Sequence, residues 1–164
     1  MKDIKNTFIE KLHECNQHKN RLLKAKKHLQ RYMPIDEEYY REFDDITMGF
    51  IDQMIFRFSK LQDTMGEKLF PSLLELMGED VKSKPFIDRL NRIEELGILY
   101  KNDWMDLRKD RNDIAHEYSF NQEEVVDGIN VIYNSTDKLT KIYDTFYGYC
   151  KERFEFVEKS EVLG

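Results

Sequence analysis

The fold is decided by the stretch between residues 50 and 65, which reads FIDQMIFRFSKLQDTM. Its apolar side chains recur at steps of three or four residues, with further apolar positions beside them. These side chains are Phe50, Ile51, Met54, Ile55, Phe58, Leu61 and Met65. Such spacing gathers them on one broad face of an α-helix. A face this wide is typical of a helix buried at the centre of a helical protein.

Working outward from this stretch, we expect five helical segments. They cover residues 4–32, 36–77, 85–96, 103–118 and from 121 onward. The first ends before Pro34, and Gly66 and Pro71 are expected to kink or split the later part of the second. The last segment is longer than a small bundle needs, so residues 154–164 are expected to overhang and meet a partner. The sequence therefore predicts a single all-α domain over residues 1–164, an antiparallel bundle of four main helices plus a short one.

The composition supports this fold class and excludes others. The chain has 164 residues, 40% hydrophobic and 35% charged, with only 7 Gly and 3 Pro. So few turn-forming residues argue against a β-sandwich or barrel. No apolar run reaches the roughly 20 residues of a membrane span, and the first residues do not form a secretory signal. Cys15 and Cys150 lack zinc-ligand spacing, so we expect reduced thiols in a cytoplasmic protein.

The charge is unevenly distributed along the chain. The net charge is −6, which argues against a protein that coats nucleic acid by bulk electrostatics. Residues 1–33 nevertheless hold nine Lys or Arg against three Asp or Glu. This basic first helix has two interpretations: it faces an anionic partner, or it complements acidic neighbours in its own fold.

The most informative segment is residues 104–118, WMDLRKDRNDIAHEY. Steps of three and four place one arginine on a face of large apolar or aromatic groups. The members of this face are Trp104, Leu107, Arg111, Ile114 and Tyr118. A guanidinium in an apolar face is costly unless it is paired or solvated at an interface. Either a structural ion pair with a carboxylate or a functional position at an interface would account for Arg111.

The same helix holds a histidine in a chemically suggestive setting. His116 stands five residues after Arg111, so the two do not share one helix face and do not form a zinc-binding histidine pair. Asn112 stands four residues before His116 and can reach its ring, which would fix the tautomer. Tyr118 follows at the expected helix end. This grouping favours a functional role for the segment.

Residues 111–118, RNDIAHEY, resemble the signature of the HEPN superfamily: Arg, four residues, His, one residue and Tyr, with a polar residue after the arginine. The stretches 56–66 and 86–97 also look like the corresponding regions of HepT-like members. The resemblance covers roughly residues 40 to 125. Members often carry another polar residue on an earlier helix, for which Asp45, Asp52 and Arg57 are open candidates.

The resemblance implies a homodimer in which two copies of the motif face one cleft and cleave RNA without a metal or other cofactor. Arg111 would hold the phosphate, and His116 would act as acid or base. Asn112 and Tyr118 would support them. The resemblance further implies a toxin whose antitoxin, a minimal nucleotidyltransferase, transfers AMP to Tyr118.

Two other functions stay open from the sequence. Some HEPN proteins are non-catalytic and bind nucleotide or substrate for a minimal nucleotidyltransferase. A purely structural or adaptor bundle is the third possibility.

Overall fold

The computed structural model describes residues 3–114 and 121–164, and within this part of the chain every regular element is a helix, with no strand. The all-α prediction is thus confirmed. The α-helices are α1 (Ile4–Leu29), α2 (Glu37–Glu42), α3 (Asp45–Thr64), α4 (Phe70–Leu76), α5 (Phe86–Glu95), α6 (Lys101–Ile114), α7 (Gln122–Arg153) and α8 (Glu155–Glu158). A 3₁₀ turn, η1 (Gln30–Tyr32), follows α1, and a π-helical turn, η2 (Met65–Leu69), joins α3 to α4.

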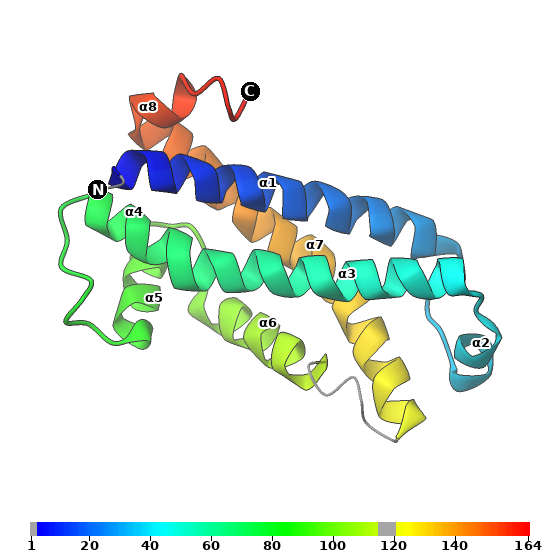
Figure 1. The fold of residues 1–164 in the computed structure, drawn as a ribbon. Helices are drawn as coiled ribbons and strands as arrows, with labels where there is room; N and C mark the ends of the chain where they lie inside the picture. Colours follow the sequence, from blue (N-terminus) through cyan, green and yellow to red (C-terminus); the bar gives the residue numbers. More distant parts are fainter. Residues whose placement is uncertain (1–2, 115–120) are drawn as a thin grey trace.

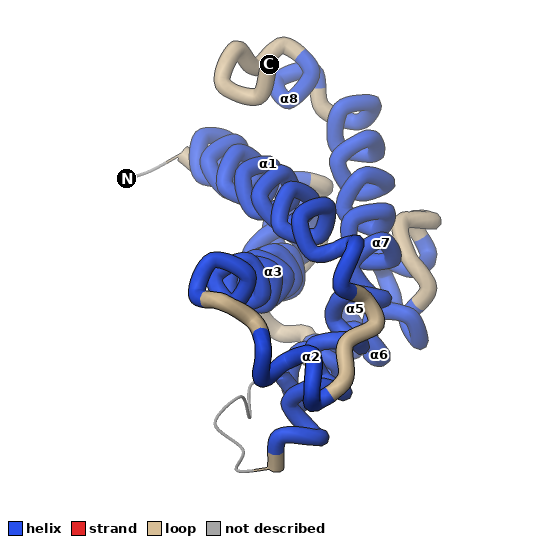
Figure 2. Tube along the Cα trace, turned by 90° about the vertical axis from the view of Figure 1, so that its right-hand side faces the viewer, coloured by secondary structure: helices blue, strands red, loops and turns tan. Residues whose placement is uncertain are grey.

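Four long elements make the bundle. Helix α1 runs out along α3, which returns antiparallel beside it, while α7 crosses behind both and α6 lies along the lower side of α3 (Figure 1). The view along α1 and α3 shows these two helices as one layer, with α6 and α7 closing the bundle (Figure 2). The core they enclose is continuous, and its largest fully buried side chains are Trp104, Tyr143, Phe8, Phe58 and Phe70.

The expected second helix differs from the prediction at its start. Instead of running unbroken from residue 36, the chain forms the short α2 and then begins α3 anew at Asp45. The Asp44 carboxylate accepts a hydrogen bond from the backbone N–H of Thr47 at 2.8 Å. This N-cap satisfies a donor that the first helical turn would otherwise leave unpaired, so it favours a new helix start here.

The later part of that helix stays continuous. Gly66 lies within the π-helical turn η2, and Pro71 lies in the first turn of α4, where its missing N–H is tolerated. The helical winding therefore continues across both residues, and Figure 1 shows α4 set at an angle to α3, so the helix is kinked rather than split.

The expected C-terminal overhang is wrong. Helix α7 ends at Arg153, and the chain turns back through α8 toward the start of α1. The rings of Phe154 and Phe156 each pack against Phe8 with centroids 6.4 Å apart, and Val157 is buried. Burial of these apolar groups within the chain is more favourable than leaving them on a free helix end.

No helix among the described residues is both long and apolar enough to cross a membrane. Cys15 and Cys150 are free and buried. Burial raises the pKa of the Cys15 thiol to about 12, so this side chain behaves as an apolar core group.

The buried hydroxyl of Tyr143 generates a test of how α7 is joined to α1. It lies 2.6 Å from Asn16 Oδ1 and 3.1 Å from the Leu12 carbonyl oxygen. We expect Tyr143→Phe to lower the free energy of unfolding by about 1 kcal/mol, because it removes this buried hydrogen bond. Urea unfolding measures the change, with Tyr147→Phe on the same helix as the control. Equal effects of the two variants would contradict this role for the hydroxyl.

Candidate functional site

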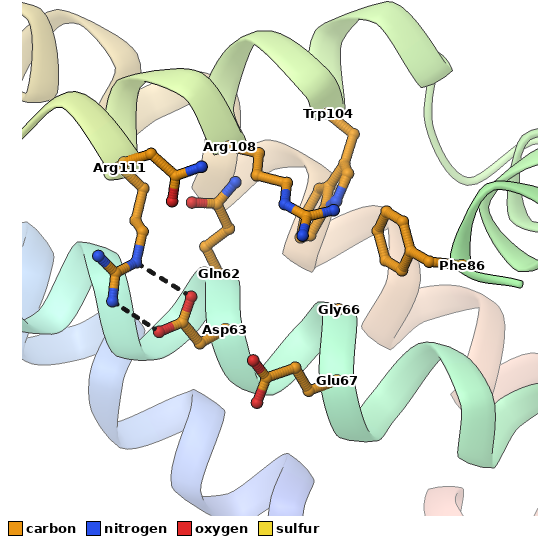
Figure 3. A pocket seen from close by; sticks show the side chains of 9 residues that line it. Gln62, Asp63, Gly66, Glu67, Phe86, Trp104, Arg108 and Arg111 are labelled. Atoms are coloured by element: carbon orange, nitrogen blue, oxygen red, sulfur yellow. Dashed lines mark hydrogen bonds and ion pairs between the residues drawn. The ribbon is translucent and has the colours of Figure 1, made fainter. Parts of the chain in front are cut away.

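The site is built around an ion pair between α6 and α3. The Arg111 guanidinium reaches from α6 to the Asp63 carboxylate on α3, with Nε 3.2 Å from Oδ1 and Nη2 3.1 Å from Oδ2 (Figure 3). This is the parallel two-bond geometry that a guanidinium and a carboxylate prefer. The side chains keep 27% and 36% of their surface exposed, so the pair remains accessible to solvent.

The partner of Arg111 corrects part of the sequence interpretation. Trp104, Leu107 and Ile114 from the same helix face are buried in the chain's own core, and Arg111 lies at the edge of that core. Asp63 satisfies the guanidinium within one chain. No second copy of the chain is therefore needed to pair Arg111, and the ion-pair interpretation is confirmed. The homodimer stays a prediction without this support.

The ion pair with Asp63 leaves part of the hydrogen-bonding capacity of Arg111 unused. The bonds to Asp63 use two N–H groups, whereas a guanidinium carries five. The same side chain can thus hold a carboxylate and donate to a second anion, such as a phosphate. In such an arrangement Asp63 fixes the orientation of the guanidinium before the second anion binds.

Two hollows open between α3 and α6, and Asp63 and Arg111 line both of them. The Trp104 hollow has a volume of about 390 Å³, and its other lining residues are Gln62, Gly66, Glu67, Phe86, Trp104, Arg108 and Asn112. The Phe56 hollow has a volume of about 460 Å³, and its other lining residues are Asp52, Ile55, Phe56, Ser59, Lys60 and Ile114. The ion pair thus stands at the junction of two adjacent binding spaces.

The π-helical turn η2 shapes the wall of the Trp104 hollow. A Cβ added at Gly66 would lie 3.2 Å from Trp104 Cζ2, tighter than ordinary contact, so glycine lets the indole pack against α3 here. Glu67 in the same turn lines the hollow and is exposed. Single π-helical turns are frequent at functional sites, which agrees with its place here.

The structure describes only some of the predicted site residues. Arg111 and Asn112 line the Trp104 hollow together, whereas His116 and Tyr118 lie outside the described residues. Among the open candidates on the earlier helix, Asp52 lines the Phe56 hollow. Asp45 and Arg57 line neither hollow.

Sequence reasoning missed Asp63 and Gln62. Asp63 lies in the stretch 56–66 that looks like a region of HepT-like members, and the one available signal was the need of Arg111 for a carboxylate. Gln62 stands four residues after Phe58 and is 3% exposed, so an amide occupies the buried face of α3. A polar side chain on such a face was a visible signal that the sequence interpretation did not use.

A cationic cluster lies beside the Phe56 hollow. Its members are His18 and Arg21 on α1 and Arg57 and Lys60 on α3. Arg57 Nη1 donates to His18 Nδ1 at 2.9 Å, and the buried Arg57 Nε has no hydrogen-bond partner among the described residues. Burial lowers the pKa of His18, and the nearby Arg57 charge lowers it further. Because Lys60 also lines the Phe56 hollow, the cluster brings positive charge close to Arg111, in a hollow that Asp52 and Asp63 also line.

Some of the other basic residues of α1 complement acidic neighbours in the same fold, and others remain available to an anionic partner. Lys19 pairs with Asp144, and Lys26 lies 2.9 Å from Asp137, both partners being on α7. These lysines complement the chain's own acidic surface. Lys24, Lys27 and Arg31 instead line an open hollow at the end of α1, where they present positive charge to solvent.

Comparisons with protein-family models, with curated proteins and with solved structures find no match. Within the part of the chain that the structure describes, no group of three or more His, Cys, Asp or Glu side chains could hold a metal ion. The function of the site therefore has to be inferred from its residues and from the motif.

His18 gives a pH dependence that tests the cationic cluster. Its pKa is lowered by burial and by Arg57, so folding favours the neutral ring. Stability is then complete above the unfolded pKa of about 6.5 and is lost as pH falls from there through the folded value. We expect the wild type to lose more free energy of unfolding than His18→Gln when the pH is lowered from about 7.5 to about 5.

The measurement is urea unfolding at both pH values, with His13→Gln, exposed on the same helix, as the matched control. A wild type and a His18→Gln variant with the same pH dependence would contradict the assignment of this neutral histidine.

Proposed function

We propose that this chain is a metal-independent endoribonuclease of the HEPN type, acting as the toxin of a toxin–antitoxin pair. The observation that carries the proposal is the orientation of Arg111 by Asp63 at the junction of two hollows. The HEPN-like motif adds a histidine five residues later in the sequence, and the cationic cluster adds positive charge beside the same junction.

The proposed reaction uses the RNA's own 2′-hydroxyl as nucleophile. His116 accepts the proton of the 2′-OH, the O2′–P bond forms and the P–O5′ bond breaks, which yields a 2′,3′-cyclic phosphate and a 5′-hydroxyl end. Arg111 donates to the phosphorane oxygens, where negative charge accumulates in the transition state. A second acid must protonate the leaving 5′-oxygen, and a second motif in a homodimer would supply it as the partner's histidine. Asn112 would orient His116.

The charge around the site favours single-stranded RNA as the substrate class. Arg57 and Lys60 come from α3 and Arg21 from α1, so these two helices bring positive charge together near the Phe56 hollow. Positive charge at such a place attracts a phosphate backbone. The overall charge of −6 restricts this attraction to the site rather than to the whole molecule.

A second candidate is a non-catalytic partner that binds nucleotide or substrate for a minimal nucleotidyltransferase. In that role Arg111, held by Asp63, would bind the phosphate of the ligand without taking part in cleavage. RNA cleavage by the isolated chain separates the two candidates.

The first test is cleavage of single-stranded RNA by purified protein in the presence of EDTA. We expect products that end in a cyclic phosphate, no cleavage by His116→Ala, and a rate about 100-fold lower for Arg111→Ala, because a transition-state charge contact is lost. Lys109→Ala, exposed on the same helix, is the matched control and should cleave like the wild type. Activity that disappears with EDTA and returns with magnesium would contradict the proposal.

The homodimer is tested by mixing inactive chains. If each site combines residues of two motifs, heterodimers of Arg111→Ala and His116→Ala chains regain some cleavage. Light scattering on the wild type should show a dimer at micromolar concentration. A fully active monomer would rule the shared site out.

Control by an antitoxin is tested at Tyr118. We propose that a cognate nucleotidyltransferase transfers AMP to its hydroxyl, which puts a bulky anion beside the RNA phosphate site and so blocks binding by charge and size. Mass spectrometry after co-expression should show adenylate on the peptide that contains Tyr118, with cleavage lost in parallel. Tyr118→Phe should escape the modification. Adenylate at another residue, or modified protein that cleaves at the normal rate, would contradict this control.

A further inference from the structure

The least explained group in the described structure is the carboxamide of Gln62. The residue is 3% exposed, and neither its Oε1 nor its Nε2 has a hydrogen-bond partner. A buried amide without partners is costly to the fold, so it is expected to pair with a group outside the chain, either a ligand or a bound water. Figure 3 shows the carboxamide reaching from α3 toward α6, between the side chains of Arg108 and Arg111, and the residue lines the Trp104 hollow.

The side chains around Gln62 are of the kinds that bind a flat aromatic ligand. Trp104 and Phe86 line the hollow, and the Arg108 guanidinium lies 4.7 Å from the centre of the Phe86 ring. Arg108 is exposed, so its side chain has room to move aside from the amide or to offer its planar face for stacking. Aromatic rings and guanidinium planes are the groups on which proteins stack unpaired bases.

We propose that the Trp104 hollow binds one unpaired nucleobase of the RNA, whose hydrogen-bonding edge is read by the Gln62 carboxamide. The amide offers a donor and an acceptor side by side, which matches the paired groups on a base edge. Arg108 stacks on the base, and Trp104 forms the apolar wall. The identity of the ligand as RNA rests on the proposed function, and Arg111 at the rim sets the base next to the phosphate that it holds.

Two features argue against a purely structural role for Gln62. A structural amide would be expected to bond to backbone or side-chain groups around it, and Gln62 bonds to none in the described structure. Its hollow also has room for a base at about 390 Å³, within the range of small-molecule sites.

The test uses the fluorescence of Trp104, the single tryptophan of the chain. Purified protein is titrated with AMP, CMP, GMP and UMP, and with ribose 5-phosphate as the probe that lacks a base. We expect saturable quenching by at least one nucleotide and none by the sugar phosphate. Quenching by ribose 5-phosphate equal to that by the nucleotides, or no quenching by any nucleotide, would overturn the proposal.

Gln62→Leu is the decisive variant. It should weaken nucleotide binding about tenfold or more, because the base loses its hydrogen bonds, and it should leave the thermal unfolding temperature unchanged or raise it, because an unpaired amide is removed. Gln53→Leu, on the same helix but outside the hollow, is the matched control and should bind like the wild type. Unchanged binding by Gln62→Leu would overturn the role of the amide.

The source of the base is tested with a single-stranded trinucleotide of the preferred base. Tighter binding than that of the mononucleotide supports RNA, since the backbone gains contacts to cationic groups. Equal or weaker binding would overturn the RNA assignment in favour of a free nucleotide. These titrations do not depend on cleavage. Nucleotide binding by a protein that lacks nuclease activity would contradict the proposed function alone. RNA cleavage without base-dependent binding would contradict the base site alone.

Discussion

The Arg111–Asp63 ion pair is the constraint on which the arrangement of the site depends. It joins α6 to α3 at the edge of the core, where Trp104, Leu107 and Ile114 have already fixed the helix by burial. Because both side chains stay partly exposed, the pair contributes at most about 1 kcal/mol to stability. Its larger effect is geometric, since two parallel bonds hold the guanidinium plane in one orientation.

The oriented guanidinium of Arg111 lies where the two hollows meet. The Phe56 hollow adjoins Lys60 and the cationic cluster, where a backbone can bind by charge. The Trp104 hollow presents aromatic walls and the unpaired Gln62 amide, where a base can bind by stacking and hydrogen bonds. A phosphate held at Arg111 would have a base on one side and further backbone on the other. The proposed endoribonuclease is the function for which both hollows have a use.

The sequence predicted the helical class because apolar side chains recur at helical spacing in residues 50–65 and 104–118 and because turn-forming residues are few. The sequence prediction failed where one particular interaction determines where a helix begins or how the chain folds back. The Asp44 cap ends one helix and begins another, and such a cap is hard to see within a continuous amphipathic pattern. The C-terminal phenylalanines fold back because Phe8 offers a tertiary contact that no local pattern indicates.

Only the part of the candidate site that lies within one short segment of the sequence was predictable. The motif identified Arg111 and Asn112 through residues close together in the sequence, and both lie at the Trp104 hollow. The partner of Arg111 is 48 residues away, so only the folded chain selects Asp63 among 32 acidic residues. Gln62 was likewise readable as a polar residue on a buried face, but its lack of partners is a property of the structure alone.

The most direct test of this account is a double-mutant cycle of Asp63→Asn and Arg111→Gln, measured both as the RNA cleavage rate and as the free energy of unfolding. If Asp63 orients Arg111 for a phosphate, the double variant cleaves no more slowly than Arg111→Gln alone, and the coupling in stability stays within about 1 kcal/mol. Cleavage that is unaffected by Asp63→Asn, together with a large coupling in stability, would show that the pair only holds two helices together.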